Sequence, residues 1–230
     1  MRVVGAVSFY NETEGNLLAR CLAALRPLVD HLVCIDGAYT DFPLHNNSAA
    51  STDGSLDVAR SRADVLIQSP ASGPWSSEVL KRNVYLGCGQ PGDWFLVVDA
   101  DEIVEGTIDR AMLETRPDWL AQLYRTDLAG AWRQRMGDES EEALRRASIW
   151  IHRLFAWRPG IRYHGTHHAV HVGDTLIHPG QLDTEAGARF PGLRIAHHQD
   201  ERSAERRAVK QTYYDRLRKN EMTFRLGYGL

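Results

Sequence analysis

The chain has 230 residues, of which 43% are hydrophobic, so it can bury a full core as one domain. Its net charge of -3 gives no bulk electrostatic attraction to nucleic acid or membranes. Three scattered cysteines are too few for a disulfide framework. The apolar run before Asn11 is too short for a signal peptide, and no run approaches the roughly 20 residues that span a bilayer. We therefore expect a soluble, cytoplasmic protein.

The first hundred residues alternate between short apolar runs and helical patterns. The apolar runs predict strands at residues 3–8, 31–36, 64–68 and 95–98. Apolar residues at helical spacing predict helices at residues 17–25, 56–62 and 76–88. A short β-α-β connection favours parallel strands joined by a right-handed crossover. This half of the chain is therefore predicted to be an α/β unit.

The pattern is less regular after Glu102. We expect a helix at residues 107–114, and strands at 119–124, 149–155 and 161–172. Residues 138–146 are charged and predict a loop or a short helix, and residues 200–221 predict a final helix. Because no linker-like break interrupts the chain, residues 1–230 are predicted to form one domain.

The predicted strand at residues 95–98 ends in acids, at Asp99-Ala100-Asp101-Glu102. The run before it has no polar interruption, which is typical of a parallel strand covered on both faces. Asp99 and Asp101 alternate, so in an extended chain their carboxylates point to the same side. Ligands in open α/β sheets bind beyond the carboxyl ends of the strands, and paired carboxylates suit Mg²⁺ or Mn²⁺. An acidic turn that caps the next helix is the structural alternative.

Three further polar groups are expected at the same edge of the sheet. They are the loop Phe9-Tyr10-Asn11-Glu12, Asp36 at the end of the second strand, and Lys81-Arg82-Asn83 before the acidic strand. An acid for a base or ribose, cations for phosphates and a carboxylate pair for a metal describe a nucleoside-diphosphate site. Each group also has an ordinary interpretation: Asp36 as a turn residue, Lys81 as a solvated helix position, and the aromatic rings as core.

These motifs, in this order, resemble the family 2 glycosyltransferases of the GT-A fold. Ser8-Phe9-Tyr10-Asn11-Glu12 is similar to the family's Pro-x-Tyr-Asn-Glu loop without its proline, and Arg82-Asn83 and Asp99-Ala100-Asp101 match its later motifs. The family's Asp-Asp-Gly-Ser-x-Asp sequence is interrupted here. Asp36-Gly37 stands at the strand end, and the remainder recurs as Ser51-Thr52-Asp53-Gly54-Ser55. Either Asp41 or Asp53 could therefore be its second contact.

The resemblance implies a Rossmann-like GT-A fold, with a mostly parallel sheet flanked by helices. Residues 1–105 would bind the nucleotide sugar, and residues 106–230 the acceptor. It implies a metal-dependent glycosyltransferase that uses Mn²⁺ or Mg²⁺, a donor linked to UDP, and an inverting mechanism. The acceptor stays open between a glycan, a protein, a small molecule and a modified DNA base. The expected donor-binding residues are Phe9, Tyr10, Asn11, Glu12, Asp36, Lys81, Arg82, Asn83, Asp99 and Ala100.

The same resemblance assigns chemistry to these groups. Negative charge grows on the diphosphate as the bond to the sugar breaks, and a divalent cation with Lys81 or Arg82 would stabilise it. Asp36 would accept a hydrogen bond from the uracil N–H. Asp99 and Asp101 would hold the metal, with a late histidine as third ligand: His197 first, and His198 second.

The catalytic base is less defined. His168 stands where a family segment carries glutamate, and its ordinary pKa near neutrality suits a general base. Asp127, Asp183 and Glu185 are rival candidates. Most histidines lie between His152 and His198, which also leaves a zinc site open, although no His-Glu-x-x-His sequence occurs.

Two other functions remain open. A sugar nucleotidyltransferase would use a similar sheet, but such enzymes begin with a glycine-rich phosphate loop that residues 8–15 lack; release of pyrophosphate would identify one. A non-catalytic metal-binding or sugar-binding protein would hold zinc through its histidines. The basic residues of the final helix predict a solvated face, with a nucleic-acid acceptor as the minority interpretation.

Overall fold

The computed structural model describes residues 1–40, 42, 48–115, 120–125, 149–165, 170–173, 175–178 and 188–227. For residues 120–125, 149–152, 175–178, 188–189, 191 and 217–227 the description covers the backbone alone.

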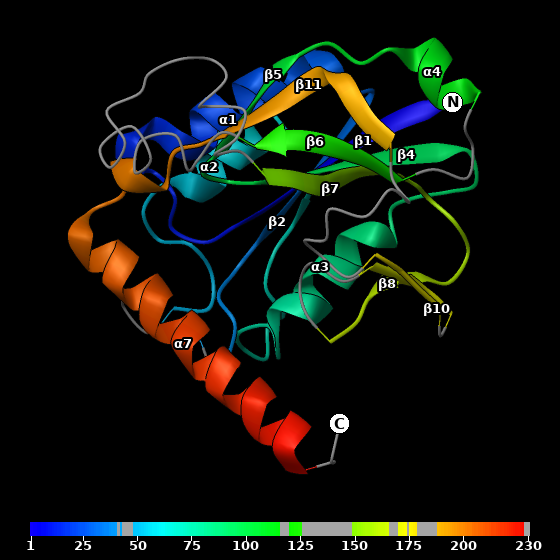
Figure 1. Cartoon of the computed structure of the whole chain (residues 1–230). Helices are drawn as coiled ribbons and strands as arrows, with labels where there is room; N and C mark the ends of the chain where they lie inside the picture. The colour runs from blue at the N-terminus through cyan, green and yellow to red at the C-terminus, as the bar shows by residue number, and fades with distance from the viewer. Residues whose placement is uncertain are drawn as a thin grey trace, which may run out of the picture.

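The described residues build one large sheet of eight strands in the order β3-β2-β1-β4-β7-β6-β11-β5. Strands β3, β2, β1 and β4 are parallel, as are β6 and β11, whereas β7 and β5 pair antiparallel with their neighbours. Figure 1 shows this sheet across the body of the molecule. The strands are β1 (Arg2–Phe9), β2 (His31–Asp36), β3 (Val65–Ile67), β4 (Asp93–Asp99), β5 (Glu102–Gly106), β6 (Leu120–Arg125), β7 (Ile149–Ala156) and β11 (Ala188–His197).

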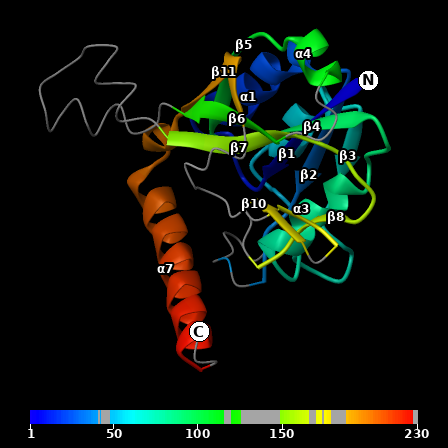
Figure 2. The same cartoon turned by 45° about the vertical axis from the view of Figure 1, so that its right-hand side comes forward.

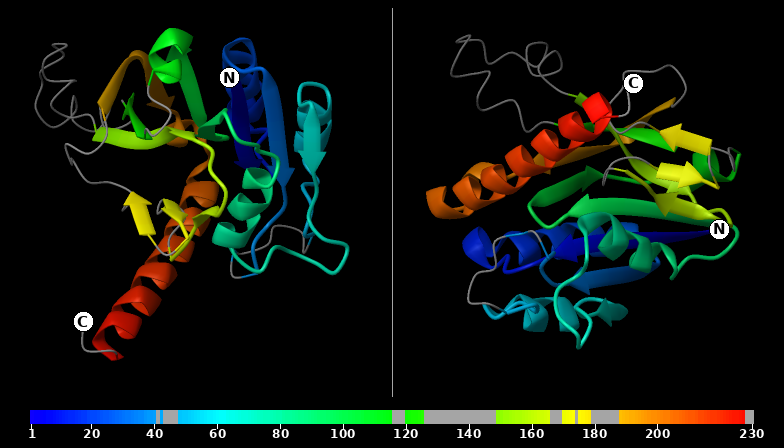
Figure 3. Two further views of the ribbon diagram at one scale, coloured as in Figure 1. Left: turned by 90° about the vertical axis from the view of Figure 1, so that its right-hand side faces the viewer. Right: turned by 90° about the horizontal axis from the view of Figure 1, so that it is seen from below.

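Helices connect these strands, and a small second sheet lies beside α3 (Figures 1 and 3). The helices are α1 (Leu17–Leu25), α2 (Ser55–Arg60), α3 (Glu78–Leu86), α4 (Arg110–Glu114) and α7 (Ala204–Gly227), with 3₁₀ turns at η1 (Glu14–Asn16), η2 (Arg26–Leu28) and η4 (Gln199–Glu201). The small sheet is antiparallel and consists of β8 (Ile161–Tyr163), β9 (Val170–Val172) and β10 (Thr175–His178).

The parallel strands are buried on both faces, as the uninterrupted apolar runs predict. In β4, Leu96 and Val98 pack on one face with α1 and α4, whereas Phe95 and Val97 pack on the other with α3. Alternate residues of β1 divide between the faces in the same way. The outcome is a mixed α/β fold with helices on both faces of the sheet, which is compatible with a Rossmann-like arrangement.

Strand β4 lies on one side of β1, whereas β2 and β3 lie on the other. The chain runs from β1 to β2 and β3 on one side and then returns past β1 to β4 on the other, so the strand order reverses between β1 and β4 at a topological switch point. In open α/β sheets a ligand crevice forms at such a point, beyond the carboxyl ends of the strands. The topology alone therefore predicts a ligand site at the carboxyl ends of β1 and β4.

Several expectations for the second half need correction. Strand β5 was not predicted, although it begins directly after the acids and pairs with β11. The single strand expected at residues 161–172 is two strands, β8 and β9, which pair with each other, and β10 was also not predicted. The described part of the chain holds no helix that is both long and apolar enough to cross a bilayer.

The last helix, α7, leaves the carboxyl-end edge of the sheet and extends away from the body of the molecule (Figures 1 and 2). Ser203 precedes it, and its hydroxyl accepts a hydrogen bond from the Arg206 backbone N–H at 3.2 Å, as an N-cap does. The Ser203 N–H and hydroxyl in turn donate to the Glu14 carboxylate, at 2.9 Å each. The start of α7 is therefore tied to the loop after β1.

Candidate functional site

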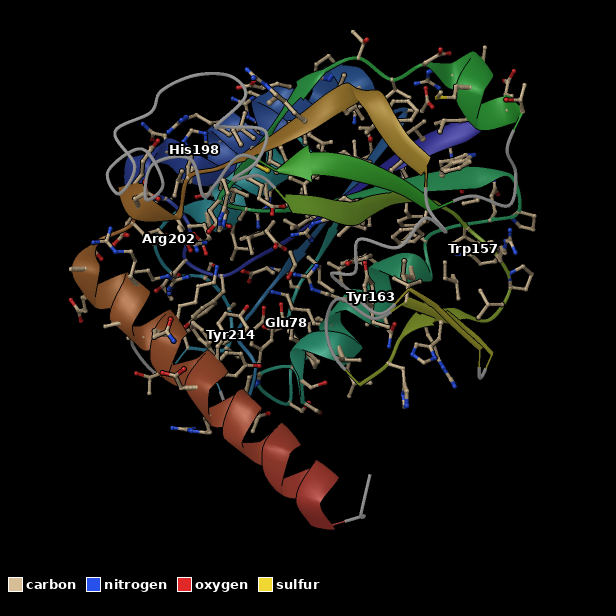
Figure 4. The ribbon with its side chains drawn as sticks, viewed as in Figure 1. Glu78, Trp157, Tyr163, His198, Arg202 and Tyr214 are labelled. Carbon is tan, nitrogen blue, oxygen red and sulfur yellow. The ribbon has the colours of Figure 1, made fainter. Side chains whose placement is uncertain are left out.

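A small cavity of about 70 Å³ opens beyond the ends of β1 and β4. Its walls are formed by residues of the loops after β1 and β2, of α3, of the acidic turn and of α7. Figure 4 shows Arg202 just before α7, and Tyr214 and Glu78 between α7 and α3. The lining residues are Ser8, Phe9, Tyr10, Glu12, Ala38, Tyr39, Phe42, Glu78, Arg82, Asp99, Ala100, Asp101, Arg202, Arg206, Lys210, Tyr213 and Tyr214.

Asp99, the last residue of β4, is held between two arginines. Arg82 of α3 donates to one of its carboxylate oxygens at 2.6 Å, and Arg153 of β7 donates to the other at 2.7 Å. Burial opposes the charge, but Arg153 and Arg82 hold the pKa of the Asp99 carboxyl well below its usual range. Asp99 is therefore ionised and fixed in orientation.

Asp101 is more deeply buried and faces cations from the C-terminal segment. Its Oδ2 accepts from Arg202, lies 3.1 Å from His197 Nε2 and 3.4 Å from Lys210 Nζ. Burial opposes the charge, but Lys210 and Arg202 hold the pKa of the Asp101 carboxyl well below its usual range. Its Oδ1 is buried without a hydrogen-bond partner among the described residues. One oxygen of Asp101 is thus available to a ligand that the described residues do not supply.

Glu12 fixes α7 over the cavity. Arg202 donates to both of its carboxylate oxygens, at 3.0 and 2.6 Å, and Arg206 donates to one of them at 3.1 Å. Arg206 also donates to the Tyr10 carbonyl. Because these side chains are buried, the ion pairs carry a desolvation cost, and the loss of one partner would leave a buried charge with fewer contacts. The glutamate of the predicted donor loop therefore has a clear structural role.

Asp36 and Lys81 are fully buried and do not line the cavity. The Asp36 carboxylate accepts the Ser51 hydroxyl at 2.5 Å and the Ser51 N–H at 3.1 Å. Lys81 Nζ donates to the carbonyls of Phe9 and Gly37, at 2.7 and 2.6 Å. Burial raises the pKa of Asp36 and lowers that of Lys81 to about 7. Lys81 thus joins the loops after β1 and β2, and its ammonium does not face the space where phosphates were expected.

The loops themselves need unusual backbone geometry. Gly37 has φ +116°, and a Cβ there would lie 2.7 Å from Ser69 Cβ and 2.9 Å from Trp75 Nε1, so glycine is required. Asn11 also has a positive φ of 50°, and its side-chain oxygen accepts the Thr52 N–H at 2.8 Å. The hydrogen bonds from Ser51 to Asp36 bring the Asp36-Gly37 sequence and the Ser51–Ser55 segment together, although 13 residues separate them in the chain.

The remaining predicted donor residues divide between the cavity and the core. Phe9, Tyr10 and Ala100 line the cavity. Asn83 lies outside it and forms a pair of hydrogen bonds with the Tyr163 backbone, at 3.0 and 2.6 Å, which ties α3 to β8. Asp53 accepts the N–H and hydroxyl of Thr13, at 2.9 and 2.8 Å, and so holds the loop after β1.

The late histidines have different surroundings. His197 reaches Asp101 as described, whereas the His198 ring lies 2.7 Å from the Glu201 carboxylate, and its backbone N–H donates to the Asp101 carbonyl. His197 is therefore the one placed beside the acidic pair. The four candidates for the catalytic base, Asp127, His168, Asp183 and Glu185, lie outside the described residues.

The donor set partly fits a divalent cation. Asp101 Oδ1, the Asp99 carboxylate and His197 offer the oxygen and nitrogen ligands that Mn²⁺ accepts. However, the described residues contain no group of three or more His, Cys, Asp or Glu already arranged around a common point. The unpaired Asp101 Oδ1 is the observation in favour of a metal, and the ion pairs on Asp99 and on Asp101 Oδ2 are contacts with which it would compete.

Four cations at this site, Arg153, Arg202, Arg206 and Lys210, were not predicted to belong to it. Arg153 lies in the middle of β7 and also binds Glu102 at 2.8 Å. The sequence feature that could have identified Arg153 is its charge within an otherwise largely apolar strand. Arg202, Arg206 and Lys210 were assigned to a solvated helix face, yet all three line the cavity. Arg206 and Lys210 are four residues apart and so lie on one face of α7, which was the available signal, whereas Arg202 precedes the helix.

Aromatic rings form the other missed feature. Tyr39 stacks on Tyr213 of α7 with ring centroids 5.8 Å apart, and Phe42 lies edge-on to Tyr213 at 5.3 Å. The Arg206 guanidinium lies 5.9 Å from the Tyr10 ring centroid. These contacts join the loop after β2 to α7, so the aromatic side of the cavity depends on that helix as well.

Comparisons with known proteins do not indicate an activity for this chain. No protein-family model matches the chain. Two curated relatives, from Mycobacterium bovis and Mycobacterium tuberculosis, are both described as uncharacterized proteins. Each is 29% identical to this chain over 237 residues, covering 100% of this chain and 53% of the relative. The chain therefore spans about half the length of the curated relatives it matches.

Proposed function

We propose that the protein is a metal-dependent glycosyltransferase of the GT-A type, which transfers a sugar from a nucleotide donor to an acceptor hydroxyl. One observation carries the proposal. Asp99 and Asp101 line the same cavity at the topological switch point, and Asp101 Oδ1 is buried there without a partner among the described residues. Paired carboxylates in that position suit a hard cation shared with phosphate oxygens.

In this proposal Asp101, Asp99 and His197 hold Mn²⁺ or Mg²⁺. The cation supplies Lewis-acid stabilisation of the charge that develops on the leaving diphosphate. Arg82 and Arg153 keep Asp99 ionised and oriented, and Arg202 does the same for Asp101. Phe9 and Tyr10 would contact the nucleoside, with UDP as the expected nucleotide.

The donor role predicted for other residues changes. Asp36 is engaged with Ser51, so it acts on the nucleoside only through the loop that it positions. Lys81 and Asn83 hold backbone segments in place and serve the site indirectly. His168, Asp127, Asp183 and Glu185 remain the candidates for the base, and an inverting outcome remains part of the proposal.

A screen of nucleotide sugars tests this function. Purified protein is incubated with individual UDP-, GDP-, TDP- and CMP-linked sugars, with Mn²⁺ or with a chelator, and release of the nucleotide is measured. The proposal predicts slow, metal-dependent hydrolysis of one donor, and loss of that hydrolysis in Asp101→Asn. Circular dichroism must show that the variant is folded. Hydrolysis that is equally fast with the chelator, or release of pyrophosphate from a nucleoside triphosphate, would contradict it.

A further inference from the structure

Lys210 is the most exposed and the least bonded of the cations that line the cavity. Its side chain is 30% exposed, and its one described polar contact is to Asp101 Oδ2, at 3.4 Å. The side chains of Arg82 and Arg202 are only 3% and 4% exposed. An ammonium at 3.4 Å is a weak hydrogen-bond donor, so this contact is mainly electrostatic.

The other cations are already committed. Arg82 is bound to both Glu78 and Asp99, and Arg202 to both Glu12 and Asp101. Arg206 donates to Glu12 and to the Tyr10 carbonyl. Moving any of these three would take at least one ion pair or hydrogen bond away from a buried carboxylate or carbonyl. Lys210, by contrast, is free to rotate on a long flexible side chain.

The charges that line the cavity are balanced without a ligand. Four acids, Glu12, Glu78, Asp99 and Asp101, face four bases, Arg82, Arg202, Arg206 and Lys210. A divalent cation on Asp101 adds positive charge next to the Lys210 ammonium and repels it. A diphosphate adds negative charge within reach of α7. The balance therefore favours a change of partner by Lys210, which has the fewest contacts among the described lining cations.

The small volume of the cavity also points to a movement of Lys210. Its volume of about 70 Å³ is well below the roughly 300–1,000 Å³ of pockets that enclose small-molecule ligands. A nucleoside diphosphate therefore needs more room than the lining side chains leave, so some of them must move outward when it binds. Lys210 is the lining cation whose departure breaks the fewest described bonds.

We propose that Lys210 is an exchangeable counter-ion: a divalent cation at Asp101 displaces its ammonium, which then binds the diphosphate of the donor. This inference rests on the proposed function. Lys210 competes with the metal when no nucleotide is present and cooperates with it when the nucleotide is bound. Its removal should therefore strengthen one binding reaction and weaken the other, which a merely structural residue would not do.

The experiment compares wild type, Lys210→Met, Lys210→Arg and Arg216→Met. Methionine keeps the aliphatic length and removes the charge, and arginine restores the charge. Arg216 is an exposed residue of α7 that does not line the described cavities, so Arg216→Met controls for the loss of one positive charge on the helix. Calorimetry measures Mn²⁺ alone, UDP with saturating Mn²⁺, and uridine with saturating Mn²⁺.

For Lys210→Met we expect Mn²⁺ alone to bind about threefold tighter or more, and UDP to bind roughly tenfold weaker, a size typical of losing one charge-assisted contact. Uridine affinity should stay unchanged, Lys210→Arg should recover UDP affinity, and Arg216→Met should resemble wild type. Equal weakening of metal and UDP, or no change in either, would overturn the inference while wild-type binding still supported the function. A wild type that binds neither Mn²⁺ nor UDP would overturn both.

Discussion

At the scale of single residues, the site is a set of buried ion pairs built behind the cavity. Glu102 is fully buried; its carboxylate accepts the Asp99 backbone N–H at 2.8 Å and binds Arg153 at the same distance. Arg153 therefore joins the strand end to the residue that follows the acidic turn. The acids at 99 to 102 could be read from the sequence, but their partners could not, because Arg153 lies more than 50 residues further along the chain.

Removing Arg153 should destabilise the fold. Arg153→Met removes the buried ion pairs to Glu102 and Asp99, and we expect the free energy of unfolding to fall by about 3–5 kcal/mol, as measured by urea denaturation. Adding Glu102→Gln to that variant should recover part of the loss, because it removes a buried charge that Arg153 balances. Additive losses in the double variant would show that the two side chains do not act as a pair.

Lys81 should make stability depend on pH in an identifiable window. Its folded pKa is lowered to about 7 by burial, whereas its usual value is 10.5. Between these values the unfolded chain binds more protons, so the free energy of unfolding should rise with pH, by at most about 1.4 kcal/mol per unit for one proton. Urea denaturation at pH 7 and 9.5 measures this. The free energy of unfolding of the wild type minus that of Lys81→Met should increase from pH 7 to pH 9.5. A constant difference would mean that the pKa of Lys81 is not lowered in the folded protein.

At the scale of elements, the parallel strands and a final helix were predictable, whereas the face by which α7 docks was not. The apolar runs of β1, β2 and β4 are long enough to identify strands covered on both faces, and the structure confirms them. By contrast, α7 is rich in charge along its whole length, so its inward face resembles its outward face in the sequence. Its docking depends on Glu12, which binds Arg206, and on Tyr39 and Phe42, which contact Tyr213. These three partners are far from α7 in the chain.

Docking of α7 should loosen when Glu12 loses its charge. Glu12→Gln weakens the pairs with both Arg202 and Arg206, so backbone amides of residues 204–214 should exchange hydrogen about tenfold faster or more, as measured by mass spectrometry. Glu205→Gln removes an exposed acid from the first turn of the same helix and serves as the control. Equal exchange in the two variants would mean that Glu12 does not hold the helix.

At the scale of the whole molecule, topology explains why distant motifs converge. Parallel strands place the loops after β1 and β2 and the acidic turn after β4 at one edge of the sheet. Strand β11 ends at the same edge with His197, and α7 begins a few residues later. The sequence could predict the first group from strand order, because each motif directly follows a strand. It could not predict which cations α7 contributes, because that depends on how the helix docks.

The most direct test of the central claim is the binding of UDP to the wild-type protein with and without Mn²⁺. If Asp99 and Asp101 hold a cation that in turn holds a diphosphate, calorimetry should show UDP affinity at least roughly tenfold higher with Mn²⁺ than with a chelator. Uridine, which has no phosphates, should show no such dependence. An affinity for UDP that is the same in Mn²⁺ and in chelator would contradict the proposed role of the acidic pair.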